Sequence, residues 1–318
     1  MAIFIRDFRD GELLECLETD PSHFGDGLVP RDDAIRAWQL LMRSPAFNCG
    51  VAEVDPPLGG RHIIAFGSAA FVSRRFADNE IANPRPGLTD RVIASVAKKE
   101  SVVVDLAELA RRNATDGVDL VTLSGYWDEA LLDAEGITEI GTAMSVSFVQ
   151  ATRGYRLRTM MTEGIGRSQI RFLESTAVFR TIGAFRTGRE NTERALMVVT
   201  RDDVDTKLGS VVAPLFHYQD PTLRLRPTDQ DLLHAALRDD DDEHIATALN
   251  VRPSAIKKRW TTVFDRVWAT RPDLLPRNED GDDGSRGKRK RHRILAYVRD
   301  HPEELRPYDW SAAARTGG

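Results

Sequence analysis

Hydroxyl-bearing and cationic side chains recur along one side of a helix predicted over residues 253–267. With about 3.6 residues per turn, that side and its flanks carry Ser254, Lys257, Lys258, Arg259, Thr261 and Thr262. The opposite side carries Ile256, Trp260, Val263, Phe264 and Val267. A helix anchored by such an apolar side suits the major groove, because its outward groups can reach base edges and phosphates. The simpler interpretation is an amphipathic helix whose charged side faces solvent.

The residues before this helix have the spacing of a tight turn between two crossing helices. Ala246 provides a small side chain at the crossing, and Asn250 tolerates the left-handed backbone that the turn needs. Val251 then fills the space between the helices, and Ile256 packs back from the next one. An earlier helix, opening at 227–230 with Thr228 as its N-cap, completes the pattern. The spacing therefore predicts a helix-turn-helix.

A second group of cations lies at 286–293, where six of eight residues are Lys or Arg. Four of them are interpreted as phosphate contacts of a basic arm, namely Lys288, Arg289, Lys290 and Arg291. The alternative is the solvated start of a helix. Residues 222–318 carry 19 Lys and Arg against 17 Asp and Glu, whereas the whole chain has a net charge of −5. Basic character is therefore local to the C-terminal part.

Residues 225–267, from LRPTDQ to VFDRV, resemble the LuxR-type helix-turn-helix. The resemblance implies that Lys257, Lys258 and Arg259 contact DNA. It departs from the family at the acidic run 239–242 and at Trp260. The partners we expect are double-stranded DNA, RNA polymerase, a small-molecule effector and, from the symmetry of DNA sites, a second copy of the chain in a homodimer.

In the N-terminal part, MSVSFVQA and the following Arg153-Gly154-Tyr155 resemble the strand, loop and helix of GNAT acetyltransferases. The resemblance implies that the loop offers backbone amides to the pyrophosphate of acetyl-CoA, with Arg153, Gly154 and Tyr155 as candidate contacts. The family motif R/Q-x-x-G-x-G/A would need Arg or Gln at Ala151 and Gly or Ala at Arg156. These departures favour a GNAT-like domain without catalysis and without a bound cofactor. The alternatives are another α/β sensor, an oligomerisation domain, or a GAF- or PAS-like fold.

Periodicity places helices and strands alternately along the first two thirds of the chain. The predicted helices are 11–19, 31–43, 89–99, 106–113 and 155–163, and the predicted strands are 51–54, 61–72, 101–105, 118–123, 144–150 and 195–200. The fold class is therefore a mixed α/β (α+β) domain followed by an all-α helix-turn-helix domain. The predicted divisions are a sensor or oligomerisation domain 1–213, a linker 214–224, the helix-turn-helix domain 225–277, an acidic linker 278–287 and a basic tail 288–318.

The sequence contains no Walker A motif, Rossmann fingerprint or nucleophile elbow, and its histidines have no metal-ligand spacing. We therefore predict no catalytic residue, metal or cofactor. No apolar run is long enough to cross a membrane, so we expect a cytoplasmic, nucleoid-associated protein. The predicted function is a sequence-specific transcriptional regulator without enzyme activity. The alternatives are a GNAT-like acyltransferase with an accessory helix-turn-helix, and a protein-interaction module that uses the same helices.

Overall fold

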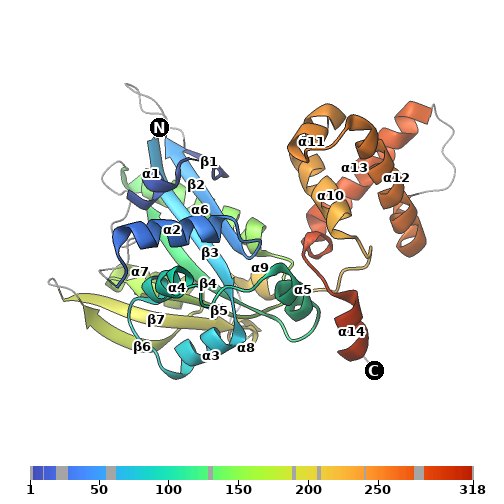
Figure 1. The fold of residues 1–318 in the computed structure, drawn as a ribbon. Coiled ribbons are helices and arrows are strands. Elements are labelled where there is room, and N and C mark those ends of the chain that lie inside the picture. Colours follow the sequence, from blue (N-terminus) through green and yellow to red (C-terminus); the bar gives the residue numbers. More distant parts are fainter. Residues whose placement is uncertain are drawn as a thin grey trace. The chain divides into compact units, whose positions relative to one another are not determined.

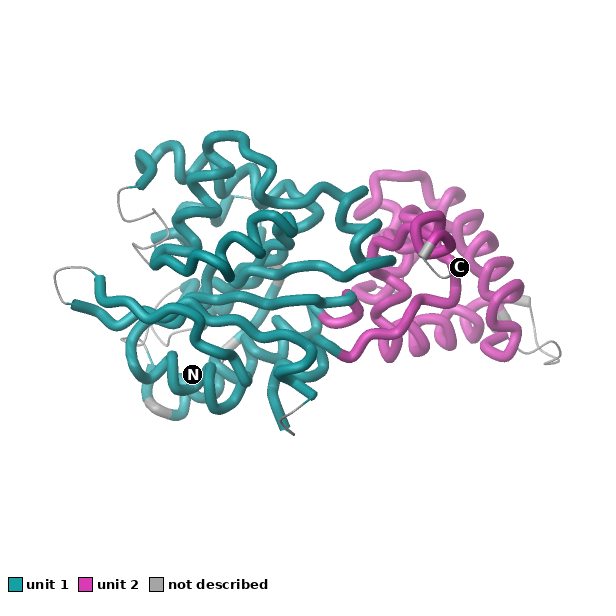
Figure 2. The backbone as a smooth tube through the Cα atoms, turned by 90° about the horizontal axis from the view of Figure 1, so that it is seen from below, with its two compact units in different colours: residues 1–152, 156–216 teal, residues 153–155, 217–318 magenta. Residues whose placement is uncertain are grey.

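The chain forms two compact units in the computed structural model, which describes residues 3–9, 11–18, 28–54, 62–127, 132–187, 191–205, 209–239, 241–275 and 283–316. The N-terminal unit consists of Met1–Thr152 and Arg156–Phe216. The C-terminal unit consists of Arg153–Tyr155 and His217–Gly318, so it takes three residues from the middle of the chain (Figure 2).

The N-terminal unit is built on one sheet of seven strands (Figure 1). The strands are β1 (Ile3–Asp7), β2 (Phe47–Val54), β3 (His62–Val72), β4 (Val118–Trp127), β5 (Leu157–Ile165), β6 (Arg180–Thr187) and β7 (Thr192–Thr200). The helices are α1 (Leu13–Glu18), α2 (Arg31–Met42), α3 (Arg74–Ala82), α4 (Leu88–Ala97), α5 (Leu106–Ala114), α6 (Ala134–Thr152), α7 (Arg167–Thr176), α8 (Arg201–Asp205) and α9 (Ala213–Phe216).

The strands lie in the order β1-β2-β3-β4-β5-β7-β6, and β4 with β5 is the parallel pair among otherwise antiparallel neighbours. A parallel connection needs a crossover, which α6 provides between these two strands. The mixed α/β class predicted from the sequence is confirmed.

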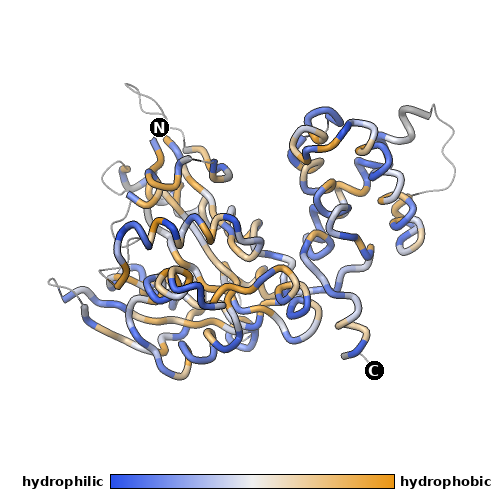
Figure 3. Tube along the Cα trace, in the orientation of Figure 1, coloured by the Kyte–Doolittle hydropathy of each residue, from blue (hydrophilic) through white to orange (hydrophobic). Residues whose placement is uncertain are grey.

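Both faces of the sheet are covered, because successive residues of a strand point to opposite sides. On β2, Val51 belongs to a core cluster with helices α1, α2 and α4, whereas the next residue, Ala52, packs with Ile140 of α6. Trp38 of α2 is fully buried and packs edge-on against Phe66 of β3. Figure 3 shows the resulting hydrophobic stretches along the strands of the sheet.

Two predicted elements are wrong in kind. Residues 144–150, predicted as a strand, form the second half of helix α6, and residues 155–163, predicted as a helix, are largely strand β5. The run MSVSFVQ contains β-branched and aromatic residues, but strand propensity depends strongly on context. Ile140 and Met144, one helical turn apart, decide the outcome by packing together against the sheet. The predicted strand 101–105 is reduced to one bridge, between Val72 and Val103.

The described residues of the C-terminal unit form helices and turns. The α-helices are α10 (Pro227–Arg238), α11 (Asp242–Ala248), α12 (Pro253–Thr270), α13 (Asp283–Asp300) and α14 (Trp310–Thr316), with the short 3-10 helices η3 (Pro272–Leu274) and η4 (Pro302–Leu305). Their core includes the residues Leu232, Leu233, Ile245, Ile256, Trp260, Val263 and Ile294.

The turn before α12 has the backbone expected of it. Asn250 has φ of +50°, the left-handed region that Asn tolerates, and Ala246 is buried beside the turn. Helix α10 begins at Pro227, so Thr228, the predicted N-cap, is its second residue. Arg226 is the N-cap, and Asp229 accepts a hydrogen bond from the Arg226 backbone N–H.

The predicted linker 214–224 is well packed at both ends. Leu215 is buried in α9 of the N-terminal unit, and Leu223 is fully buried in the C-terminal unit. The first half of the predicted acidic linker, 278–282, lies outside the described residues, and α13 starts at Asp283, within its second half. Within the described part of the chain, no helix combines the length and apolar character that crossing a membrane requires.

Candidate functional site

The sheet opens between β4 and β5. The two strands pair only from Val118 with Leu157 to Val121 with Met161. Beyond those residues β4 continues to Trp127 and β5 continues to Ile165, without pairing with each other. Ligands of α/β sheets commonly bind beyond the carboxyl ends of parallel strands, where the strands and their connections leave room.

A β-bulge marks the place where β4 leaves β5. Opposite β3, Ser68 aligns with Ser124 and Ala69 aligns with Thr122, so Leu123 is the extra residue of β4. A bulge bends its strand and increases the local twist. The bulge and the end of the β4–β5 ladder therefore lie within two residues of each other, and together they shape the gap.

The other end of the pair is held closed by a buried carboxylate. Asp119 is fully buried and accepts hydrogen bonds from Arg74 Nε (3.0 Å), Arg158 Nε (2.6 Å) and Thr159 Oγ1 (2.7 Å). Arg158 and Thr159 belong to β5, whereas Asp119 belongs to β4. The two strands are thus fixed together at one end and diverge at the other.

The first turn of α4 bridges the gap on the face covered by α1 and α2. Thr89 Oγ1 donates to the Leu123 carbonyl (2.6 Å), at the bulge of β4. On the β5 side, the backbone N–H groups of Gly87 and Leu88 donate to Glu163 at 2.9 and 2.8 Å. Arg194 also reaches Glu163, at 3.5 Å. Because these donors occupy its oxygen atoms, the buried Glu163 carboxylate holds the turn in place.

A hydroxyl without a partner lies at the start of the gap. Thr122 Oγ1 is buried and has no hydrogen-bond partner among the described residues. Thr122 is the first residue of β4 beyond the ladder with β5. A buried polar group normally has a partner, and this hydroxyl is available to donate a hydrogen bond. A ligand in the gap could accept a hydrogen bond from this hydroxyl.

The loop from β4 to α6 is the strand-loop-helix connection at the open end of the gap. The loop consists of residues 128–133, with the sequence DEALLD, which contains no glycine and no cation. Residues 128–131 lie outside the described residues. Asp133 Oδ1 accepts a hydrogen bond from the Gly136 backbone N–H (2.8 Å), so a carboxylate already caps the helix. Glu135 lies in the first turn. These residues do not fit the pyrophosphate of coenzyme A, which needs exposed amides and positive charge.

Arg153, Gly154 and Tyr155, the cofactor contacts predicted from the sequence, lie elsewhere. They connect the end of α6 to the start of β5, so the order is helix, loop, strand. Arg306 Nε donates to the Arg153 carbonyl (3.0 Å), and the Arg306 guanidinium lies 4.9 Å from the centre of the Tyr155 ring. Burial raises the pKa of Tyr155, and this effect outweighs the opposite effect of the neighbouring Arg306.

Gly154 leaves no room for a ligand either. Its φ is +89°, and a Cβ at this position would lie 2.6 Å from the Glu303 backbone nitrogen. The glycine is needed for close packing within the C-terminal unit. The loop therefore differs from the strand-loop-helix on which the pyrophosphate contact was based, and the role of Arg153, Gly154 and Tyr155 as cofactor contacts stays a prediction.

Helix α12 carries the DNA contacts predicted from the sequence. Ser254, Lys257, Lys258 and Thr261 are exposed, and Arg259 and Thr262 are half-buried. Thr261 and Thr262 donate to the carbonyls of Lys257 and Lys258, both at 3.2 Å. These hydroxyls therefore bond to their own helix, as Thr side chains often do. The role of the six residues as DNA contacts stays a prediction.

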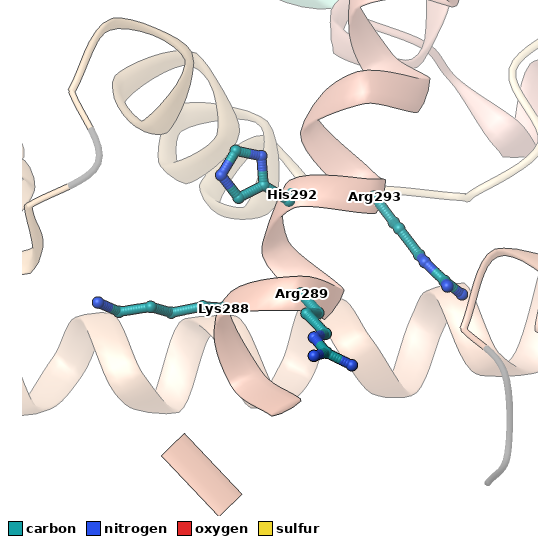
Figure 4. A pocket seen from close by; sticks show the side chains of 4 residues that line it. All are labelled: Lys288, Arg289, His292 and Arg293. Atoms are coloured by element: carbon teal, nitrogen blue, oxygen red, sulfur yellow. The ribbon is translucent and has the colours of Figure 1, made fainter. Parts of the chain in front are cut away.

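The basic residues of α13 divide into two groups. Arg291 bonds Asp242 at 2.7 Å and lies 4.8 Å from the centre of the Trp260 ring, while Lys290 lies over the Phe264 ring. Lys288 and Arg289 are exposed and line a surface hollow with His292 and Arg293. In Figure 4 Lys288 and His292 extend to one side of α13 and Arg289 and Arg293 extend to the other, so the four do not converge on one point. A phosphate-binding role for Lys288, Arg289, Lys290 and Arg291 stays a prediction.

The sequence analysis missed Asp119, Thr122, Leu123 and Glu163. Nothing in the residue types distinguishes a strand hydroxyl that lacks a partner from one that has a partner. The sequence does carry one usable signal, because residues 118–152 contain no Lys, Arg or His. That absence argues against a phosphate site anywhere along β4, its loop and α6.

Comparison with known proteins gives structural neighbours only. The sequence matches no protein-family profile, and no curated protein matches it. One similar solved structure is a protein assigned to the GNAT acetyltransferase family from Desulfovibrio desulfuricans, with 13% identity and a TM-score of 0.34 over 63% of this chain and 99% of that one.

Two further neighbours have related descriptions. FeeM, an N-acyl amino acid synthase from uncultured soil microbes, has 10% identity and a TM-score of 0.37 over 67% of this chain and 96% of its own. The polyamine N-acetyltransferase of Drosophila melanogaster has 12% identity and a TM-score of 0.33, over 63% and 100% of the two chains.

These findings correct the functional prediction. These three neighbours are described as acyl-transferring proteins, which fits the alternative of a GNAT-like acyltransferase and not the predictions of a transcriptional regulator and of a protein without enzyme activity. They supply no support for a LuxR-type helix-turn-helix. What the neighbours share with this chain is a similarity over about 63–67% of its length at TM-scores of 0.33–0.37.

Proposed function

We propose that the N-terminal unit is an acyltransferase whose thioester donor lies in the gap between β4 and β5. The observation that carries the proposal is the divergence of this parallel pair at the Leu123 bulge. An extended donor arm that contains amide groups can hydrogen-bond to strand edges in the way an added strand does. The gap offers two such edges, one from β4 and one from β5.

The chemistry needs few groups from the protein. A nucleophilic acceptor attacks the thioester carbonyl, a bond forms to the acyl carbon, the carbon–sulfur bond breaks, and the proton of the acceptor leaves with the thiol. Main-chain N–H groups fixed at a bulge can stabilise the negative charge that develops on the carbonyl oxygen. Thr122 Oγ1 supplies a further hydrogen bond to the donor. Glu163 positions the α4 turn that limits the gap on one face.

The proposal is tested with purified full-length protein and a panel of acyl thioesters and amine acceptors. Mass spectrometry follows the formation of the acylated acceptor, and ligand-induced thermal stabilisation reports binding. We expect at least one thioester to be consumed and to stabilise the protein. A panel of short- and long-chain thioesters that neither binds nor reacts would contradict the proposal.

A matched pair of variants locates the binding site. Thr122→Val removes the buried hydroxyl of the first β4 residue beyond the ladder with β5, and Thr152→Val removes another buried hydroxyl without a partner, on the last residue of α6. Because neither hydroxyl has a partner, neither change should lower the stability of the protein without ligand. We expect Thr122→Val to weaken thioester binding by about fivefold, the effect of one hydrogen bond. Thr152→Val should bind thioesters as the parent protein does.

A further inference from the structure

We infer that the gap accepts an acyl thioester that carries no nucleotide, and that it rejects coenzyme A thioesters. The inference rests on the proposed acyltransferase function and specifies its donor. It starts from the charges around the open end of the gap, where β4 leads into α6. A phosphate-bearing donor would place its anionic groups at the beginning of that helix.

Two exposed carboxylates lie at the beginning of α6, those of Asp133 and Glu135. Residues 118–152 provide no Lys, Arg or His to balance them. Negative charges at this end of the helix repel a di-anionic pyrophosphate, and the additional phosphate on the ribose of coenzyme A increases the repulsion.

The helix end is also already capped. The Gly136 N–H donates to Asp133 Oδ1 at 2.8 Å, so this amide is not available to a phosphate. Asp and Asn are equally good residues at such a position, so the negative charge of Asp133 is not needed for the cap itself. An Asp133→Asn variant therefore keeps the hydrogen bond of the cap and removes only the negative charge.

The arginines on the β5 side of the gap do not form a phosphate-binding site. At the end of β5, Arg194 bonds Glu163 and Arg167 bonds Glu193 at 3.3 Å. Arg171 is exposed one turn further along α7. Two of these three guanidinium groups already bind carboxylates. What remains for recognition is the pair of strand edges and the Thr122 hydroxyl, which suit the amides and carbonyls of a pantetheine arm.

The test compares two probes that share the same reactive arm, S-acetyl-pantetheine and acetyl-CoA. Equilibrium binding to the full-length protein is measured by calorimetry at low and high salt. We expect acetyl-pantetheine to bind at least about fivefold more tightly at low ionic strength. The preference should shrink at about 1 M salt, where charges are screened within about 3 Å.

A charge-neutral double variant, Asp133→Asn with Glu135→Gln, keeps the cap and removes two negative charges. We expect it to improve acetyl-CoA binding severalfold while leaving acetyl-pantetheine binding unchanged. The matched control is Glu139→Gln, an exposed carboxylate one turn along the same helix. The control should leave the ratio between the two probes close to its value in the parent protein.

Three outcomes would overturn the inference. Tight acetyl-CoA binding that is lost in Arg171→Ala would mean that α7 supplies the phosphate contacts, and the proposed function would stand. Equal binding of both probes, unchanged in the neutral variant, would mean that the carboxylates do not select the donor. Failure of every thioester to bind would overturn the proposed function and this inference together.

Discussion

The Asp119 carboxylate of β4 accepts a 2.6 Å hydrogen bond from Arg158 of β5 and is completely shielded from solvent. It ties together the two strands that separate a few residues later. Because a charge buried in this way is costly without its partners, the pair is sensitive to the loss of either residue.

Replacing Asp119 by Ala should therefore destabilise the N-terminal unit. The change leaves Arg74 and Arg158, both largely buried, without their shared carboxylate. We expect a loss of about 3 kcal/mol in the free energy of unfolding, measured by urea denaturation. Asp33→Ala, which removes an exposed ion pair with Arg36, should change it by less than about 0.5 kcal/mol. Equal effects of the two changes would contradict the role assigned to Asp119.

Glu108 gives a prediction for acidic pH. Hydrogen bonds from Arg111 and Arg112 outweigh the effect of burial and lower the pKa of Glu108 to about 2. Its contribution to stability is therefore complete above the ordinary pKa of 4.5 and is lost as the pH falls toward 2. The difference in Tm between the parent protein and Glu108→Gln should be constant above pH 4.5 and shrink below it. A difference that grows on acidification would contradict this assignment.

The two thiols should differ in reactivity. Cys16 is fully buried, and burial raises the pKa of its thiol to about 12, whereas Cys49 is half-buried on β2. Because the thiolate is the nucleophile, iodoacetamide at pH 8 should modify Cys49 first. Cys16 should react only after denaturation, and peptide mass mapping distinguishes the two sites. Early modification of Cys16 would show that α1 opens readily.

Gly154→Ala should destabilise the C-terminal unit in two ways. The positive φ strains an alanine, and the new Cβ would lie 2.6 Å from the Glu303 nitrogen. Gly209→Ala is the matched control, since Gly209 has φ of +84° but nothing within 4 Å of the added carbon. The control should cost about 1 kcal/mol and Gly154→Ala clearly more. Comparable losses in thermal unfolding would mean that Glu303 moves aside.

Arg291 should stabilise the C-terminal unit, because its side chain packs within that unit. Its guanidinium bonds Asp242 and lies over the Trp260 ring, with both ion-pair partners about three-quarters buried. Arg291→Met keeps most of the aliphatic stem and should lower the free energy of unfolding by about 1–2 kcal/mol. Lys288→Met, at an exposed position of the same helix, should have no measurable effect. The reverse order of effects would show that the contacts with α11 and α12 contribute little.

Sequence periodicity predicted the elements whose packing is local or one-sided. The apolar stripe of α12, with Ile256 and Val263 fully buried, is one example, and the left-handed Asn250 is another. These features depend on residues within one or two helical turns. A pattern of single residues suffices to predict them.

The same reasoning failed where distant strands decide the structure. Helix α6 and strand β5 were exchanged because Met144 packs on a sheet that short-range patterns do not reveal. The predicted strand 118–123 ended at Leu123, the bulged residue, although β4 continues to Trp127. A bulge is defined by what lies opposite on β3. The gap and the position of Thr122 beside it could therefore not be predicted from the sequence pattern.

The three residues that the C-terminal unit takes from the middle of the chain limit how the protein can be dissected. A fragment that begins at His217 would lack Tyr155, over which the Arg306 guanidinium lies. A fragment that ends at Phe216 would leave Arg153, Gly154 and Tyr155 without the partners they pack against. A single cut after Phe216 therefore yields two incomplete pieces. Autonomous expression of either half requires a redesigned boundary at both places where the chain changes unit.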